Sequence, residues 1–172
     1  YGADGFSEMS ADDTKRATFV KAVVDLVKEK NLDGIDIDWE YPIGPDWGQA
    51  ISCSPNDGEN FIKLLSELRD ALDTLEQITD KDYTVSIAVP ASTWYVAKID
   101  VVKVASLVDT MKLMSYDYYG SWSAQTGHHA NLYNNPQDPD WGGWSTDQAV
   151  RTYLDAGVPA EKLILGVAFY GR

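Results

Sequence analysis

Apolar residues recur along the chain with two different periods. Two stretches carry them at the i, i+3, i+4, i+7 spacing that places side chains on one face of a helix. The first stripe consists of Val20, Val23, Val24 and Val27, and the second of Phe61, Leu64, Leu65, Leu68, Leu72 and Leu75. A short helix is expected near residues 99–105. Shorter apolar or alternating segments predict strands at residues 34–39, 83–89, 111–116 and 163–170.

Polar residues at the edges of the apolar stripes predict where helices begin and end. Ser10 is the expected N-cap of the first helix, and Asn31 is its expected end. Ser145 and Gln148 have the spacing of a capping box, which predicts a further helix that runs to the glycine at position 157.

Helical and strand segments alternate, and this order predicts a parallel sheet covered by helices, an α/β fold in a single domain. In such sheets the functional side chains gather at the carboxyl ends of the strands. The candidates at these ends are Asp38, Glu40, Ala88, Met114, Asp117, Tyr170 and Arg172. Long loops are expected at residues 41–58 and 117–144.

The charge balance narrows the choice of partner. The chain has 14 basic and 27 acidic residues, a net charge of −13. A surface this acidic repels phosphate groups, so we expect neither nucleic acid nor an anionic membrane as a partner, whereas a neutral substrate is compatible with it. No apolar run approaches the ~20 residues of a membrane span. Cys53 is the only cysteine, which excludes an internal disulfide and disfavours a cysteine-based zinc site.

Aromatic residues make up 12% of the chain, and several tryptophans stand beside loop-forming residues. These are Trp39, Trp47, Trp122, Trp141 and Trp144. Aromatic rings on loops suit stacking against flat ligands such as sugar rings, but packing in the core or against a loop is the alternative for each of them.

The segment at residues 35–40 carries the clearest candidate chemistry. Along a strand Asp36, Asp38 and Glu40 share one face, and apolar residues occupy the other. The apolar face requires cover by helices, which would turn the acids toward the inside of a barrel. Repulsion between the carboxylates would raise the pKa of Glu40 and let it act as a general acid. A solvent-facing strand and a Ca²⁺ or Mg²⁺ site are the alternatives, although ligands in a line surround one ion poorly.

The segment DGIDIDWEYP resembles the active-site strand of glycoside hydrolase family 18, the chitinases. The family pattern D-x-x-D-x-D-x-E is matched by Asp33, Asp36, Asp38 and Glu40. Other segments resemble later parts of the family pattern in the same order. They are residues 86–91 (fifth strand), 114–117 (M-x-Y-D), 120–122 and 126–128 (the loop that follows), and 169–172 (Y-G-R).

The resemblance implies a TIM (β/α)8 barrel, of which residues 1–172 would be a partial barrel of about four βα units. By this comparison the strands correspond to the fourth to the seventh, and the first three and the eighth are absent. The whole chain would then be part of a single catalytic domain. The implied activity is hydrolysis of chitin or chitooligosaccharides, without cofactor or metal. An extracellular location is implied by the family, although no signal peptide is visible in the sequence.

The resemblance also implies roles for individual residues. Glu40 would be the general acid and base, and the acetamido oxygen of the substrate would act as nucleophile and form an oxazolinium intermediate, with retention. Asp38 would hold the acetamido N–H and share a proton with Asp36, while Tyr116 would bind the acetamido oxygen. Asp117 and Arg172 would contact sugar hydroxyls. Met114, Ala88, Trp122 and Tyr170 would line the sugar-binding cleft.

Two other functions stay open within the same resemblance. One is a chitinase-like lectin that binds sugar without cleaving it, although such relatives usually lack the acid at the position of Glu40. The other is an endo-β-N-acetylglucosaminidase that acts on N-glycans. Trp122 and the loop at residues 126–128 favour a chitinase over the latter. The adjacent His128 and His129 are expected to serve the loop, and the oligomeric state is not predicted.

Overall fold

The structure, a computed structural model, describes residues 3–44, 52–137 and 144–172. Helices and strands alternate along these residues. In chain order the elements are α1 (Phe6–Ala11), α2 (Asp13–Lys30), β1 (Gly34–Ile37), α3 (Asp57–Thr79), β2 (Thr84–Pro90), α4 (Thr93–Lys98), α5 (Val101–Leu107), β3 (Thr110–Met114), α6 (Thr146–Asp155), the 3-10 helix η1 (Ala160–Lys162) and β4 (Leu163–Leu165).

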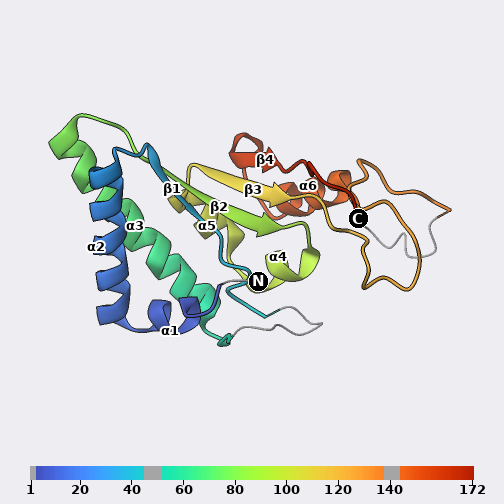
Figure 1. The fold of residues 1–172 in the computed structure, drawn as a ribbon, viewed down its shortest axis with the longest axis horizontal. Helices are drawn as coiled ribbons and strands as arrows, with labels where there is room; N and C mark the ends of the chain where they lie inside the picture. The colour runs from blue at the N-terminus through green and yellow to red at the C-terminus, as the bar shows by residue number, and fades with distance from the viewer. Residues whose placement is uncertain (1–2, 45–51, 138–143) are drawn as a thin grey trace.

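The four strands form one parallel sheet in the order β1-β2-β3-β4, which confirms the predicted α/β arrangement. Each strand therefore lies beside the strand that follows it in the chain, and helices form every connection between them. Figure 1 shows α2 and α3 side by side next to β1, and the long loop after β3 beyond the carboxyl ends of the strands.

The strand register separates an apolar face from a polar one. Ile37, Ile87 and Met111 form one row across the sheet, and each is at most 5% exposed beneath the helices. Asp36 and Ser86 pair one residue earlier, so their side chains point to the opposite face. For Asp36, the acid that lies within β1, the predicted orientation away from the helices is therefore confirmed.

Helix α3 supplies the largest apolar contribution to the core. Its six predicted stripe residues are each at most 3% exposed. They are Phe61, Leu64, Leu65, Leu68, Leu72 and Leu75. Val20 and Val27 of α2 are also buried, whereas Val23 and Val24 are only partly covered. Burial of these side chains holds α2 and α3 together, and α3 shares one apolar core with the strands of the sheet.

Ser10 does not cap the first long helix as predicted. It lies inside the additional short helix α1, where its hydroxyl donates a hydrogen bond to the Ser7 carbonyl over 3.3 Å. Asp12 is the N-cap of α2, because its carboxylate accepts hydrogen bonds of 2.9 Å from the N–H groups of Thr14 and Lys15. A helix of six residues is too short to produce a recognisable period of apolar residues in the sequence.

The later helix ends follow the prediction more closely. The Ser145 hydroxyl accepts a hydrogen bond of 3.2 Å from the Gln148 N–H, and Gly157 follows α6 with φ 95°. The helix expected near residues 99–105 is α5, which begins only at Val101. The preceding helix α4 was not predicted.

Three predicted strands are shorter in the structure, and the fourth is shifted by one residue. The segment predicted at residues 34–39 pairs only as far as Ile37, and the one at 163–170 only as far as Leu165. Pairing is lost at the carboxyl ends because the chain leaves the sheet there and continues into loops. Among the described residues, no helix is long and apolar enough to cross a membrane.

Candidate active site

The end of β1 is anchored by an aromatic cluster behind it. Trp39 is 2% exposed, stacks on Phe6 with ring centroids 5.3 Å apart and meets Phe61 edge-on at 5.6 Å. Trp39 is thus a core residue, not a sugar-stacking one. Its burial fixes the backbone on both sides, so that Asp38 and Glu40 are held on the opposite face.

The two acids at the end of β1 both hold protons more tightly than usual. Partial burial raises the pKa of Glu40, and the negative charges of Asp38 and Asp117 add to this effect, while a hydrogen bond with Tyr41 opposes it. Partial burial also raises the pKa of Asp38, and the charge of Asp36 raises it further. We expected repulsion to be the main cause for Glu40, but loss of water around the carboxyl group is the larger one.

Tyr116 joins the acids from beyond the end of β3, a strand that β2 separates from β1. It follows β3 and lies among three carboxylates, since Asp38, Glu40 and Asp117 each raise the pKa of its phenol in addition to partial burial. Gly166 makes room for this ring, because a side-chain carbon at position 166 would come within 2.8 Å of it. The predicted group of Glu40, Asp38 and Tyr116 is therefore brought together.

Asp117 is the centre of a second polar cluster. It has the left-handed conformation, with φ 58°. Its carboxylate accepts two hydrogen bonds from the Arg172 guanidinium, at 2.8 and 2.6 Å, and one of 2.8 Å from the Tyr170 hydroxyl. The Arg172 hydrogen bonds hold the pKa of Asp117 below its ordinary value. His129 lies beside this cluster, with its Nδ1 atom 3.9 Å from Asp117.

The predicted sugar-contact residues occupy different surroundings. The Arg172 guanidinium lies 5.0 Å from the centre of the Trp122 ring, which is 60% exposed and therefore accessible to a ligand. Ala88 and Met114 are half-buried on the acid-bearing face of the sheet. Trp144 is exposed and lies near Tyr118. The predicted aromatic positions Trp47 and Trp141 lie outside the described residues.

Two neighbours of Asp36 were not anticipated from the sequence. The Ser86 hydroxyl donates a hydrogen bond of 2.5 Å to Asp36, and the Lys112 ammonium lies 3.0 Å from the same carboxylate oxygen. Lys112 stands two residues before Met114 in β3 and four before Tyr116, so strand alternation places all three on one face; this spacing is the sequence signal that could have placed Lys112 on the acid-bearing face.

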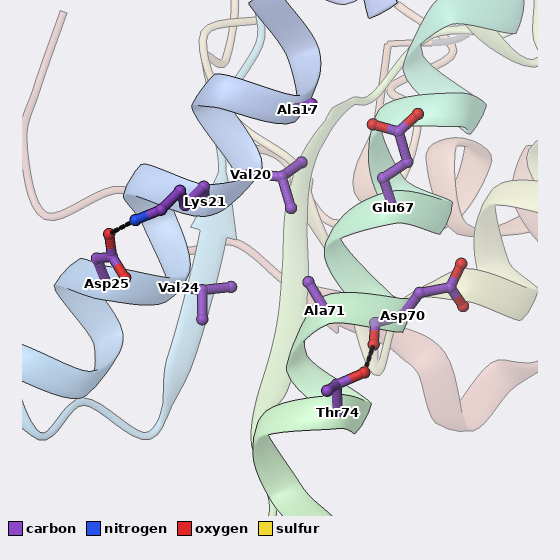
Figure 2. Close-up of a pocket in the computed structure, with 9 residues that line it drawn as sticks. All are labelled: Ala17, Val20, Lys21, Val24, Asp25, Glu67, Asp70, Ala71 and Thr74. Atoms are coloured by element: carbon purple, nitrogen blue, oxygen red, sulfur yellow. Dashed lines mark hydrogen bonds and ion pairs between the residues drawn. The ribbon is translucent and has the colours of Figure 1, made fainter. Parts of the chain in front are cut away.

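A groove elsewhere on the surface is separate from these residues. It lies between α2 and α3 and has a volume of about 580 Å³. Figure 2 shows Val20, Val24 and Ala71 on its walls and the ion pair of Lys21 with Asp25 at its rim. The acid-bearing face, in contrast, is an open surface of the sheet. Among the described residues no group of three potential ligand side chains is arranged to hold a metal ion.

Comparison with known proteins gives a consistent assignment over the whole chain. Residues 1–172 match the glycosyl hydrolases family 18. Chitinase A1 of Niallia circulans is 38% identical over an alignment of 172 positions, and the match covers 97% of this chain and 24% of that protein. The solved chitinase ChiA74 from Bacillus thuringiensis has a TM-score of 0.91 at 36% identity, over 96% of this chain and 26% of that one.

The third relative, which is also a solved structure, is a family 18 N-acetylglucosaminidase from Paenibacillus barengoltzii. Its TM-score is 0.90 at 38% identity, and the match covers 98% of this chain and 48% of that one. The chain thus spans less than half the length of each of these three relatives. Its four strands and their helices form part of a TIM (β/α)8 barrel, and the chain belongs to the glycosyl hydrolases of family 18.

Proposed function

We propose that residues 1–172 are part of the single catalytic barrel of an extracellular chitinase, which hydrolyses β-1,4-linked N-acetylglucosamine chains. The observation that carries this proposal is the grouping of Asp38, Glu40 and Tyr116 at the carboxyl ends of β1 and β3 in a family 18 chain. Two relatives support it by name: Chitinase A1, and a mutant class V chitinase from Nicotiana tobaccum whose structure contains NAG4.

Glu40 is the proposed general acid. Its raised pKa favours the protonated form that donates a proton to the glycosidic oxygen as the bond to the leaving sugar breaks. The acetamido oxygen of the substrate attacks the anomeric carbon at the same time and forms an oxazolinium ion. Glu40, now ionised, takes a proton from the water that opens this ring, so the product keeps its anomeric configuration.

The other acids and the tyrosine position the acetamido group. Asp38 accepts a hydrogen bond from the acetamido N–H and shares a proton with Asp36, and the Tyr116 hydroxyl donates to the acetamido oxygen. These contacts increase in strength as charge develops on the acetamido group in the transition state.

Residues around Asp117 are the proposed sugar contacts. Asp117 and Arg172 bind sugar hydroxyls, and the exposed ring of Trp122 stacks on the leaving-group side of the chain. Met114 and Ala88 form the floor on which the acetamido methyl rests. Tyr170 also lines the sugar-binding cleft, where its hydroxyl donates a hydrogen bond to Asp117.

The proposed reaction is tested by a comparison of substrates in the complete enzyme. If the acetamido group is the nucleophile, chitooligosaccharides are cleaved and cellooligosaccharides, which lack it, are not. A thiazoline mimic of the oxazolinium ion is expected to inhibit competitively. Cleavage of both kinds of chain at similar rates would exclude the substrate-assisted route. Binding of chitooligosaccharide without any cleavage would indicate the lectin instead.

The products that the enzyme forms from chitohexaose distinguish an exo-acting enzyme from an endochitinase and from an endo-β-N-acetylglucosaminidase. Release of single sugars from one end would match the name of the Paenibacillus barengoltzii neighbour, whereas internal cleavage is expected for an endochitinase. A release of N-glycans from a glycoprotein, without cleavage of chitohexaose, would indicate an endo-β-N-acetylglucosaminidase.

Tyr116→Phe is expected to lower kcat by a factor of about 10²–10³, by analogy with the loss of one oxyanion-hole donor. The change removes only the hydroxyl, so the aromatic packing against Tyr170 is retained. Steady-state kinetics on a fluorogenic chitobioside measures the effect. Tyr133→Phe is the matched control, because Tyr133 is 67% exposed in the loop after β3. Equal rates for the two variants would remove Tyr116 from the reaction.

A further inference from the structure

One cationic side chain reaches the acid strand from across the sheet. Lys112 belongs to β3 and Asp36 to β1, and β2 lies between these strands. The Lys112 ammonium nevertheless approaches the Asp36 Oδ1 atom to 3.0 Å, and the Ser86 hydroxyl of β2 donates to the same atom over 2.5 Å. One carboxylate oxygen thus links three strands on the acid-bearing face.

We propose that Lys112 is a positioning residue of the active site, which fixes the carboxylate of Asp36 and compensates its charge beside Asp38 and Glu40. This inference rests on the proposed function, since it assigns a role within the same reaction. Lys112 does not touch the reacting atoms. It acts through Asp36, which lies in β1 and is the first of the three acids Asp36, Asp38 and Glu40 in chain order.

The groups that face this site are predominantly acidic. β1 and the residues after it contribute Asp36, Asp38 and Glu40, and β2 contributes Ser86. β3 and the residues after it contribute Lys112, Tyr116 and Asp117. The residues after β4 contribute Tyr170 and Arg172, and His129 lies beside them. Arg172 is bound to Asp117 through two hydrogen bonds. Among the described groups named above, Lys112 is therefore the cation that is bound to an acid of β1.

Removal of the ammonium leaves the charge of Asp36 uncompensated. Because that charge already raises the pKa of Asp38, its effect on Asp38 increases, and the coupled acids take up protons at a higher pH. Both side chains of the pair are almost half exposed, at 45% and 43%, so water weakens the interaction. Neighbouring groups on one face of the sheet lie ~7–10 Å apart. At this distance, one unit of charge shifts the pKa of a neighbouring carboxyl group by about half a unit.

The experiment compares pH profiles of kcat/KM for Lys112→Met, Lys112→Arg and the parent in the complete enzyme. Activity requires that the Asp36–Asp38 pair holds no more than one proton, which sets the acidic limb, and that Glu40 is protonated, which sets the basic limb. Both limbs therefore move to higher pH when the positive charge is lost. We expect a displacement of about half a pH unit for Lys112→Met, which is about a threefold loss at a fixed pH on the acidic limb. Lys112→Arg keeps the charge and is expected to restore the parent profile.

Lys81→Met is the matched control, because Lys81 pairs with the first acid of the same motif, Asp33, over 2.9 Å but at the amino end of β1. It is expected to leave both limbs in place. A Lys112→Met profile that is lower but not displaced would reduce Lys112 to a structural role and overturn the inference. Carboxyl ¹³C NMR titration of Asp38 and Glu40 in the same proteins tests the displacement even without chitinase activity, so the inference and the proposed function fail separately.

Discussion

Glu40→Gln is expected to lower the turnover of chitooligosaccharides by about 10²–10⁴-fold, the usual contribution of general acid catalysis. The amide cannot donate a proton to the glycosidic oxygen or later accept one from water. It has nearly the same size as the carboxyl group, so the packing around Trp39 and the affinity for substrate should remain. Stopped assays give kcat, and titration calorimetry of the inactive variant with chitohexaose gives the dissociation constant.

Glu161→Gln is the corresponding control, since Glu161 is exposed on η1 and far along the chain from the acid strand. It should reproduce the parent rate. A Glu40→Gln enzyme within a few-fold of the parent would assign the proton transfer to another group. The raised pKa of Glu40 also sets a sign for the pH dependence: activity of the parent should fall as pH rises through that pKa, because the acid form is lost.

Much of the fold could be predicted because burial imposes a period on the sequence. The stripe from Phe61 to Leu75 and the alternation along β1 both identified the buried side correctly. The failures fall where periodicity has too few residues to act. Helices α1 and α4 have six residues each, and α1 displaced the cap of α2 from Ser10 to Asp12.

The candidate site was predictable where its residues are close in sequence, and less so where they meet across strands. Asp36, Asp38 and Glu40 follow from strand alternation alone. Lys112 could not be identified from the sequence, because a single lysine usually marks a solvated surface and its contact with Asp36 depends on the register of three strands. The main cause of the raised pKa of Glu40 could not be predicted from the sequence either, since desolvation depends on how the folded chain packs.

Residues 1–172 expressed by themselves are expected to self-associate and to show no measurable chitinase turnover. In the described sheet β1 and β4 are edge strands, whose unpaired backbone groups can bind another copy. Apolar side chains are exposed beside β4: Val167 is 70% and Phe169 98% accessible. The acids lie on a face open to water, where the hydrogen bonds and charges that stabilise the transition state are weakened by solvent.

Size-exclusion chromatography with light scattering, combined with a fluorogenic chitobioside assay, measures both properties on one sample. The double variant Val167→Lys and Phe169→Ser places a charge and a polar group at the exposed edge, so it is expected to shift the protein toward monomer. It should not restore turnover, because the acid-bearing face stays open. A monomer of the unmodified segment that cleaves the chitobioside as fast as a complete family 18 barrel would mean that the four βα units already enclose Glu40 sufficiently for catalysis.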